Sequence, residues 1–182
     1  MADSRSAIDE AFDRYETLSR ILEKARQSAL SNPMHDRNID LGLTQRGQKK
    51  GDAITRINET FEDLTSLINH LGILDMAAAF EKTFRARLGT AIGEARNVLR
   101  DNYKIETLRN VRQKLIHDPD NLRGLAKAIS VIRATLSKEV AELLEAIRES
   151  RNNFAHGTDI RTPPGITAEK TKDTLNEIIK SL

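Results

Sequence analysis

The sequence predicts an all-α protein, a helical bundle of five to six helices. Its 182 residues contain only four prolines and nine glycines, and 31% of the side chains are charged, a composition that favours long helices over a sheet with many turns. Apolar residues recur three or four positions apart over long segments, as on the buried face of an amphipathic helix. No segment shows the alternation of a strand. The length predicts a single helical domain over 1–182, large enough to bury a core.

The composition also excludes several classes of protein. Because the chain contains no cysteine, a disulfide framework and a thiolate zinc site are both excluded. The first ten residues carry charges every few positions and no apolar segment, so we expect no secretory signal. No run reaches the length of about 18 apolar residues that a membrane span needs. We therefore expect a cytoplasmic protein with no membrane partner.

The first predicted helix carries apolar residues from Ile8 to Ala29. It is expected to stop near Asn32-Pro33, since proline disfavours helix in the residue before it. Residues 33–51 contain one proline and three glycines and show little apolar periodicity. This composition predicts a mobile polar loop with a basic tip.

Three further helical segments follow this loop. The apolar spacing predicts a helix over 54–71 that ends at Gly72, so that His70 would lie at a helix end. A third helix is expected over about 74–102, and a short fourth segment over 103–115. The middle of the chain is thus expected to be helical, with breaks after the second and third helices.

The last part of the chain begins with Asp118-Pro119, which reads as an N-cap followed by proline at the first helical position. From there one apolar phase continues through 119–156, which is either one long helix or two helices with a break in 130–137. Residues 162–167 form a predicted turn, and the final helix begins directly after it. The inward residues of that helix are Leu175, Ile178, Ile179 and Leu182.

The charge is unevenly distributed. The whole chain has a formal net charge of only +2, too small to identify a nucleic-acid binder by itself. Residues 85–114, in contrast, contain eight basic and three acidic side chains, a local net charge of +5. This stretch is either a solvated helix face balanced by acids elsewhere or a surface that attracts phosphate. The eight bases are Arg85, Arg87, Arg96, Arg100, Lys104, Arg109, Arg112 and Lys114.

The most informative run is 151–157, at the end of the most strongly amphipathic segment. At about 100° per residue, the apolar residues of this helix fall in one arc, the predicted buried face. Arg151 falls inside the same arc, and a buried guanidinium without a partner is costly. We therefore expect Arg151 to meet an acid, an anionic ligand or a cleft between two surfaces. The arc is formed by Val140, Leu143, Leu144, Ile147 and Phe154.

Polar side chains accompany Arg151 at the end of this helix. Arg148, Asn152 and His156 form a stripe at a spacing of four residues, and Gly157 then favours the helix stop. The free carbonyls of the last turn favour a cation at His156. An imidazole beside a fixed guanidinium suits acid–base work on a phosphodiester. The alternative is structural: Arg151 pairs with an acid at the edge of the core, and His156 caps its own helix.

The run Arg151-Asn152-x-x-x-His156-Gly157 resembles the motif of the HEPN superfamily, the higher eukaryotes and prokaryotes nucleotide-binding domain. That motif is an arginine, often followed by a polar residue, with a histidine four to six intervening residues later. In the family it lies late in an all-helical domain, followed by a loop and one more amphipathic helix, as expected here for 158–182. The resemblance covers the whole chain in topology and residues 151–157 individually.

The resemblance implies a metal-independent endoribonuclease without a cofactor, of the kind found among toxins and antiviral effectors. Two protomers would bring their motif helices together in a homodimer that acts on RNA, with an antitoxin or other regulatory protein as a further partner. By position, Arg151 would stabilise the pentacovalent phosphate, His156 would act as general base or acid, and Asn152 would orient the phosphate or the histidine. Arg148 would help bind substrate. The implied products carry 2′,3′-cyclic phosphate and 5′-hydroxyl ends.

One departure and several alternatives remain. The tyrosine that follows the histidine in one toxin branch is absent, because Thr158-Asp-Ile-Arg161 stands there, which argues against that branch. The run from Arg112 to His117 has the same spacing, but it reads as a helix end and is the less favoured site. No histidines and carboxylates show metal-ligand spacing on a common face, so no metal site is expected. The same fold without catalysis, binding a nucleotide, RNA or a protein, is the main alternative, and a purely structural helical subunit is another.

Overall fold

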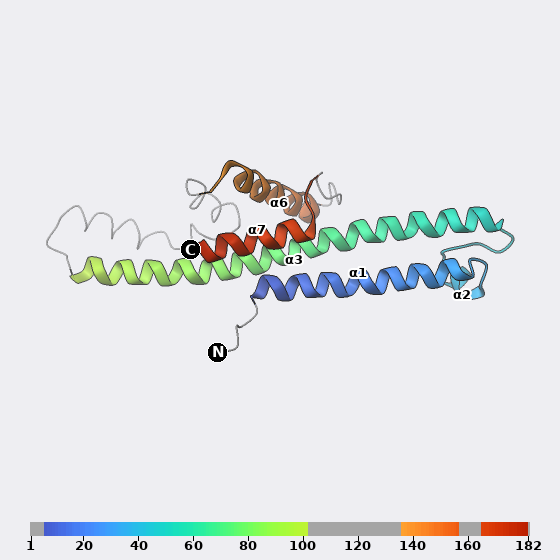
Figure 1. The fold of residues 1–182 in the computed structure, drawn as a ribbon, viewed down its shortest axis with the longest axis horizontal. Coiled ribbons are helices and arrows are strands. Elements are labelled where there is room, and N and C mark those ends of the chain that lie inside the picture. The colour runs from blue at the N-terminus through green and yellow to red at the C-terminus, as the bar shows by residue number, and fades with distance from the viewer. Residues whose placement is uncertain (1–5, 102–135, 157–164, 182) are drawn as a thin grey trace.

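The computed structural model describes residues 6–101, 136–156 and 165–181. These contain α-helices and no strand, which confirms the predicted all-α class (Figure 1). The predicted segment at 103–115 and the alternative motif from Arg112 to His117 lie outside the described residues. The helices are α1 (Ala7–Ser31), α2 (Asp36–Asp40), α3 (Lys50–Asp101), α6 (Lys138–His156) and α7 (Ala168–Ser181).

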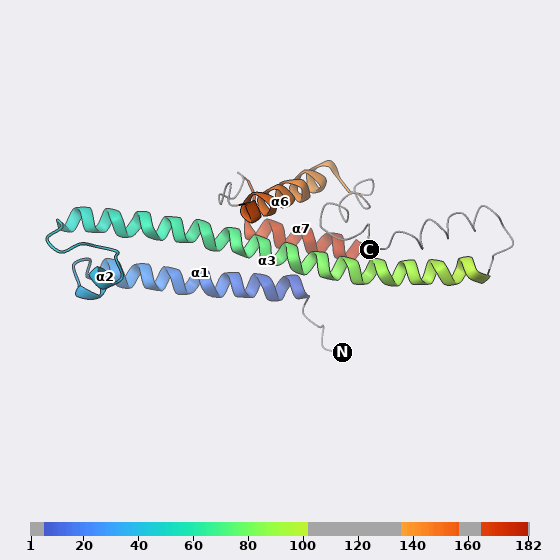
Figure 2. The same cartoon turned by 180° about the vertical axis from the view of Figure 1, so that it is seen from behind.

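The helices are arranged around the long helix α3. Helix α1 runs antiparallel beside the first half of α3, with the short α2 at the end where the chain turns between them (Figure 1). Helix α7 lies along the middle of α3, and α6 lies on the outer side of this pair in both views (Figure 2). The main core therefore forms where four helices meet, and the α1–α3 pair extends beyond it as a two-helix arm that ends at α2.

Helix α1 begins with a hydrogen-bonded cap that also contacts α7. The Ser6 side chain accepts a hydrogen bond from the backbone N–H of Asp9 at 3.0 Å, the usual N-cap geometry. The Asn176 side chain on α7 donates to Asp9 Oδ1 at 2.9 Å. The helix ends at Ser31, next to Asn32-Pro33, where the sequence predicts the stop.

The segment 33–51, expected to be a polar loop, contains more structure than the sequence indicates. Its centre is α2, and α3 already begins at Lys50. Asn38 is buried, and its Nδ2 donates to the backbone oxygens of Ala29 and Asn32, each at 3.0 Å, and to that of Pro33 at 3.3 Å. This amide therefore ties the turn to the last carbonyls of α1.

The predicted helix end at Gly72 is wrong, because α3 continues without a break from Lys50 to Asp101. A glycine in a helical pattern often marks a C-cap, but here it makes room for the ring of Tyr15 on α1. A Cβ atom at position 72 would lie 2.7 Å from Tyr15 Cδ2, closer than van der Waals contact allows. The missing side chain thus permits close helix packing.

The main core is formed by apolar side chains of α1, α3, α6 and α7 together with the turn before α7. Phe80 and Phe84 on α3 are fully buried at its centre, with ring centroids 5.8 Å apart. A smaller core of Ala29, Ile57 and Phe61 joins the two helices of the arm. The remaining main-core residues are Ile8, Ala11, Phe12, Ile73, Met76, Ala77, Leu143, Leu144, Ile147, Ile166, Ala168, Leu175, Ile178 and Ile179.

Helices α6 and α7 both begin at hydroxyl caps. The backbone N–H of Val140 donates to Ser137 Oγ at 3.3 Å, so a helix boundary lies at Ser137, at the end of the interval in which the sequence allows a break. At α7, the N–H of Lys170 donates to Thr167 Oγ1 at 3.2 Å, which confirms the predicted start of the final helix. Within the described residues, no helix combines the length and the apolar composition that a membrane crossing requires.

Candidate anion-binding site on helices α3 and α6

The inward face of α6 is the one that the apolar spacing predicts. Leu144 and Ile147 are fully buried against α3 and α7, and Leu143 is nearly so. Arg151 is one turn further along the same face, as expected from its position in the apolar arc. A guanidinium at this position therefore needs a partner on the elements that pack against α6.

The partner of Arg151 is Glu81 on α3. Arg151 Nη1 donates to Glu81 Oε1, and the pair joins two helices whose contacting residues lie 70 positions apart in the sequence. The second oxygen of the same carboxylate, Oε2, is 3.4 Å from Nη2 of Arg85, one turn along α3. Of the three options that the sequence left open for Arg151, the structure shows an acid.

Burial differs sharply within this cluster, which we call the arginine pair (Arg85 and Arg151 on Glu81). The Glu81 side chain is only 8% exposed, whereas those of Arg85 and Arg151 are 45% and 43% exposed. A carboxylate removed from water needs a charged partner. Glu81 has two such partners, one more than is needed to balance its charge. The cluster carries a net charge of +1, with its cations facing solvent.

Arg148 is also engaged, but on its own helix. Its Nε donates to Glu145 Oε1 at 2.9 Å, and its Nη2 contacts the same oxygen. The hydrogen bond to Glu145 raises the pKa of Arg148, against the opposing effect of burial. This pair is neutral overall and lies three residues apart on one helix, so it attracts an anion less than the arginine pair does.

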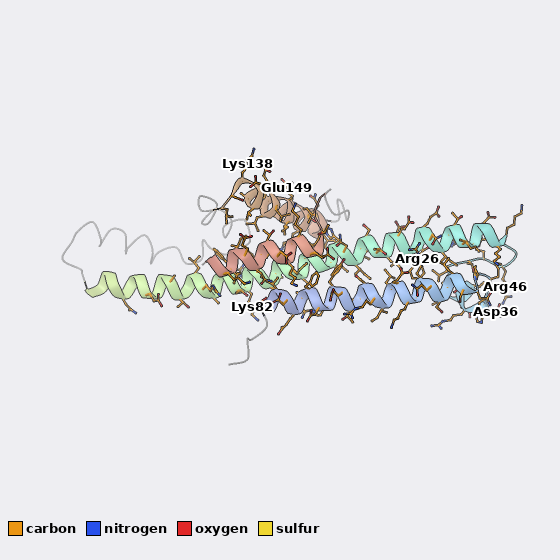
Figure 3. The ribbon with its side chains drawn as sticks, viewed as in Figure 1. Arg26, Asp36, Arg46, Lys82, Lys138 and Glu149 are labelled. Carbon is orange, nitrogen blue, oxygen red and sulfur yellow. The ribbon has the colours of Figure 1, made fainter. Side chains whose placement is uncertain are left out.

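Asn152 and His156 are exposed side chains of α6. The helix continues through His156, five residues after Arg151, which rotates the two side chains by about 140° relative to each other. Glu149, seven residues before His156 and on nearly the same line of the helix, projects outward (Figure 3). Arg151 thus faces α3, and His156 faces the other way within one chain.

The sequence did not indicate the role of His70. It predicts a helix end there, which is wrong, because His70 lies inside α3 and is fully buried. Its Nδ1 is 3.3 Å from Ser150 Oγ, and its ring packs on that of Phe154 at a centroid distance of 5.1 Å. These contacts flank Arg151 on α6 and fix the end of that helix on α3. The signal available in the sequence was the helical spacing of the apolar residues around position 70, which places this histidine on the buried face.

Within the described residues, neither a cluster of metal ligands nor a similarity to a known protein indicates the chemistry of this region. Among the described residues, no group of three or more histidines and acids could hold a metal ion. In comparisons with known protein families, with curated proteins and with solved structures, nothing matches this chain. The function therefore has to be argued from the arrangement of Glu81, Arg85 and Arg151 and from the residues on the end of α6.

Proposed function

We propose that this chain is a HEPN-type endoribonuclease that cleaves RNA without a metal ion. The observation that carries the proposal is Arg151, a guanidinium held by a nearly buried carboxylate while 43% of its side chain stays exposed. A fixed, partly exposed guanidinium is suited to bind a phosphate in a planar fork. It lies in a run of residues that resembles the HEPN motif.

The proposed reaction needs one proton acceptor, one proton donor and one cation. His156 takes the proton from the ribose 2′-hydroxyl, whose oxygen then attacks phosphorus, and the bond to the 5′-oxygen breaks. A histidine in its protonated form returns a proton to the leaving oxygen. Arg151 stabilises the negative charge that accumulates on the non-bridging oxygens of the pentacovalent phosphate. Asn152 orients the phosphate or the histidine, and Arg148 helps to bind the RNA. The products are a 2′,3′-cyclic phosphate and a 5′-hydroxyl.

The rotation between Arg151 and His156 supports a site shared by two protomers. With these side chains about 140° apart on α6, one chain does not aim both at a single phosphate. A twofold dimer through the motif helix would bring Arg151 of one protomer beside the His156 of the other. We therefore propose a homodimer acting on cytoplasmic RNA, with an antitoxin or another regulatory protein as a further partner.

Cleavage of RNA by purified protein tests the activity. We expect cleavage to persist in EDTA and to leave 2′,3′-cyclic phosphate ends. Arg151→Ala and His156→Ala should each abolish it without unfolding the protein, as circular dichroism would show. His35→Ala is the matched control, since this histidine caps α2 at the far end of the molecule. Full cleavage by His156→Ala would refute the assigned role.

Mixing the two inactive variants tests the shared site. If Arg151 and His156 act across the dimer, a heterodimer of Arg151→Ala and His156→Ala contains one intact composite site. After subunit exchange at equal amounts, about a quarter of the wild-type activity should return, because half of the dimers are mixed and each carries one of two sites. If both residues act from the same chain, the intact pair is lost in every dimer and no activity returns.

A second candidate is a helical module that binds RNA, a nucleotide or a protein without cleaving it. The same rotation favours it, since within one chain Arg151 binds an anion without any histidine beside it. Binding that weakens with salt, with no cleavage product at any pH and with the protein monomeric, would decide for this candidate.

A further inference from the structure

We propose that Arg85 and Arg151 act together as one phosphate-binding site, with Glu81 as the residue that positions both. The proposal deepens the function argued above, on which it rests for its ligand, the phosphate groups of RNA. It adds a residue of α3, Arg85, that lies outside the motif. The same chemistry would bind a free phosphate or a nucleotide, and the experiment separates these sources.

The carboxylate of Glu81 fixes where the two guanidiniums lie relative to each other. Each oxygen of the Glu81 carboxylate is occupied by a different arginine, Oε1 by Arg151 and Oε2 by Arg85. Because one small carboxylate holds both, the two guanidiniums must lie close to each other on either side of it. Their backbones belong to different helices, so the positions are set by the packing of α6 on α3. Arginine binds phosphate through paired N–H donors, so two guanidiniums held by one carboxylate can contact the same phosphate group.

An anion that approaches this cluster from solvent would meet the two guanidiniums. Glu81 is 8% exposed and both arginines are nearly half exposed, so solvent contacts the cations and hardly the carboxylate. An arginine has five N–H donors. Among the described residues, the only hydrogen bond found for either guanidinium is the one to Glu81. Donors therefore remain for a ligand, and the net charge of +1 favours an anion.

Glu81 is paired with more cations than a contact between two helices needs. The other described ion pairs contain one cation for each acid, as in Arg14 with Asp75 and Arg20 with Glu16. Holding α6 on α3 needs only one arginine on Glu81. The second arginine leaves one positive charge unbalanced beside a buried carboxylate, which a purely structural contact does not require. A phosphate would balance that charge.

Binding of a 2′-O-methyl RNA oligonucleotide tests the pair apart from catalysis, because its blocked hydroxyl prevents the proposed cleavage. Fluorescence anisotropy of a labelled single strand would be measured with wild type, Arg85→Ala, Arg151→Ala and the double variant. Each single change should weaken binding about tenfold, and the double change by much less than a hundredfold, because both arginines hold one phosphate. The salt dependence should fall by about 0.7 in slope when both arginines are removed, because together they contact one phosphate.

The control is Arg20→Ala, which removes an equal charge from an exposed pair on α1 and should leave the affinity unchanged. If an alanine variant fails to fold, Arg85→Lys and Arg151→Lys keep the charge and remove the planar fork, and they should still weaken binding. Competition with inorganic phosphate and with a nucleoside monophosphate identifies the source of the ligand. If these small competitors displace the labelled strand as well as unlabelled RNA does at the same total concentration of phosphate groups, the ligand of the site is a free phosphate group.

Several results would overturn the proposal. Arg85→Ala binding as tightly as Arg20→Ala would remove Arg85 from the site and leave the role of Arg151 intact. Unchanged binding in both single variants would show that the cluster is only a contact between helices. A wild type that binds neither RNA nor phosphate would show the same. The 2′-O-methyl oligonucleotide reports binding alone, so a wild type that binds it through both arginines but cleaves no RNA would contradict the ribonuclease and not the arginine pair. An absence of ribonuclease activity is thus distinguishable from a failure of the arginine pair.

Discussion

Arg151 on α6 and Glu81 on α3 form an ion pair between residues 70 positions apart, and the carboxylate in it is nearly buried. The pair lies at the edge of the main core, one turn beyond Ile147. Without it, α6 would place an unpaired polar side chain against α3. The same contact thus stabilises the packing of α6 and orients the cation that we assign to phosphate. Stability and binding are therefore expected to change together at this position.

Glu81→Gln should lower the free energy of unfolding by about 1–2 kcal/mol, because the two charge-assisted bonds are replaced by weaker ones and two arginines are left facing each other. The loss is small because both guanidiniums are partly screened by water. Urea unfolding followed by circular dichroism measures it. Glu16→Gln, which removes an exposed pair with Arg20, should cost less than about 0.5 kcal/mol. Equal costs for the two variants would contradict a stabilising role of Glu81.

Gly72→Ala should destabilise the protein by about 1–3 kcal/mol, because the added methyl group would press on the ring of Tyr15 and force the helices apart. Gly89 on the same helix is the matched control. Nothing lies within 4 Å of a Cβ built there, so Gly89→Ala should stabilise the protein by about 0.5–1 kcal/mol through helix propensity. Thermal unfolding of the two variants should shift in opposite directions; two stabilised variants would disprove the close packing.

Asp9 should contribute stability that is lost in acid. Burial raises the pKa of Asp9, but hydrogen bonds from Ser6 and Asn176 and the charge of Lys172 outweigh it, so the pKa lies below its ordinary value of 3.8. Because the folded state then holds the proton less tightly than the unfolded chain, the carboxylate stabilises the fold above that value. The contribution disappears as the pH falls through the lower, folded pKa.

Asp9→Asn should therefore be less stable than wild type near neutral pH, and the difference should shrink as the pH falls below about 4. Urea unfolding at several pH values from 7 to 2.5 measures the difference. Glu10→Gln removes a neighbouring exposed acid from the same helical turn and serves as the control for the helix dipole. A difference that stays constant into strong acid would rule out the lowered pKa.

Asn38→Ala should loosen the end of the arm. The side chain satisfies three backbone oxygens at the end of α1 and in the turn after it, and its removal leaves buried acceptors without a donor. We expect a loss of about 1–3 kcal/mol and faster hydrogen exchange over 32–49. Gln27→Ala, which removes an exposed amide of α1, should change neither quantity. Exchange that is equally fast in wild type would show that the amide does not order this turn.

The outer limits of the helices were predictable because local chemistry sets them. Asn32-Pro33 stops α1 and Thr167 starts α7 through contacts within a few residues. The prediction of a helix end at Gly72 is wrong because it, too, considers only neighbouring residues. The local sequence of this glycine resembles a C-cap, whereas its actual role depends on Tyr15 on another helix, which no local pattern reports.

At the candidate site, too, the sequence predicts what depends on neighbouring residues and does not predict the contacts between helices. The periodicity of α6 placed Arg151 on the buried face and so required a partner, but the partner could not be named from the sequence. Glu81 lies next to Phe80 in a helix whose local pattern gives no sign that an acid is buried. His70, Ser150 and Phe154 meet only after α6 has docked. The catalytic roles of Arg151, Asn152 and His156 remain predictions.

The continuity of α3 also has a mechanical consequence. Its 52 residues extend over about 78 Å, and Lys50 and Glu81 are separated by about 46 Å of unbroken helix. Glycine is where such a rod would bend most easily, yet Gly72 is braced by Tyr15. The arm therefore holds α2 far from the two guanidiniums along one continuous helix, so a ligand that contacted both places would have to span that length.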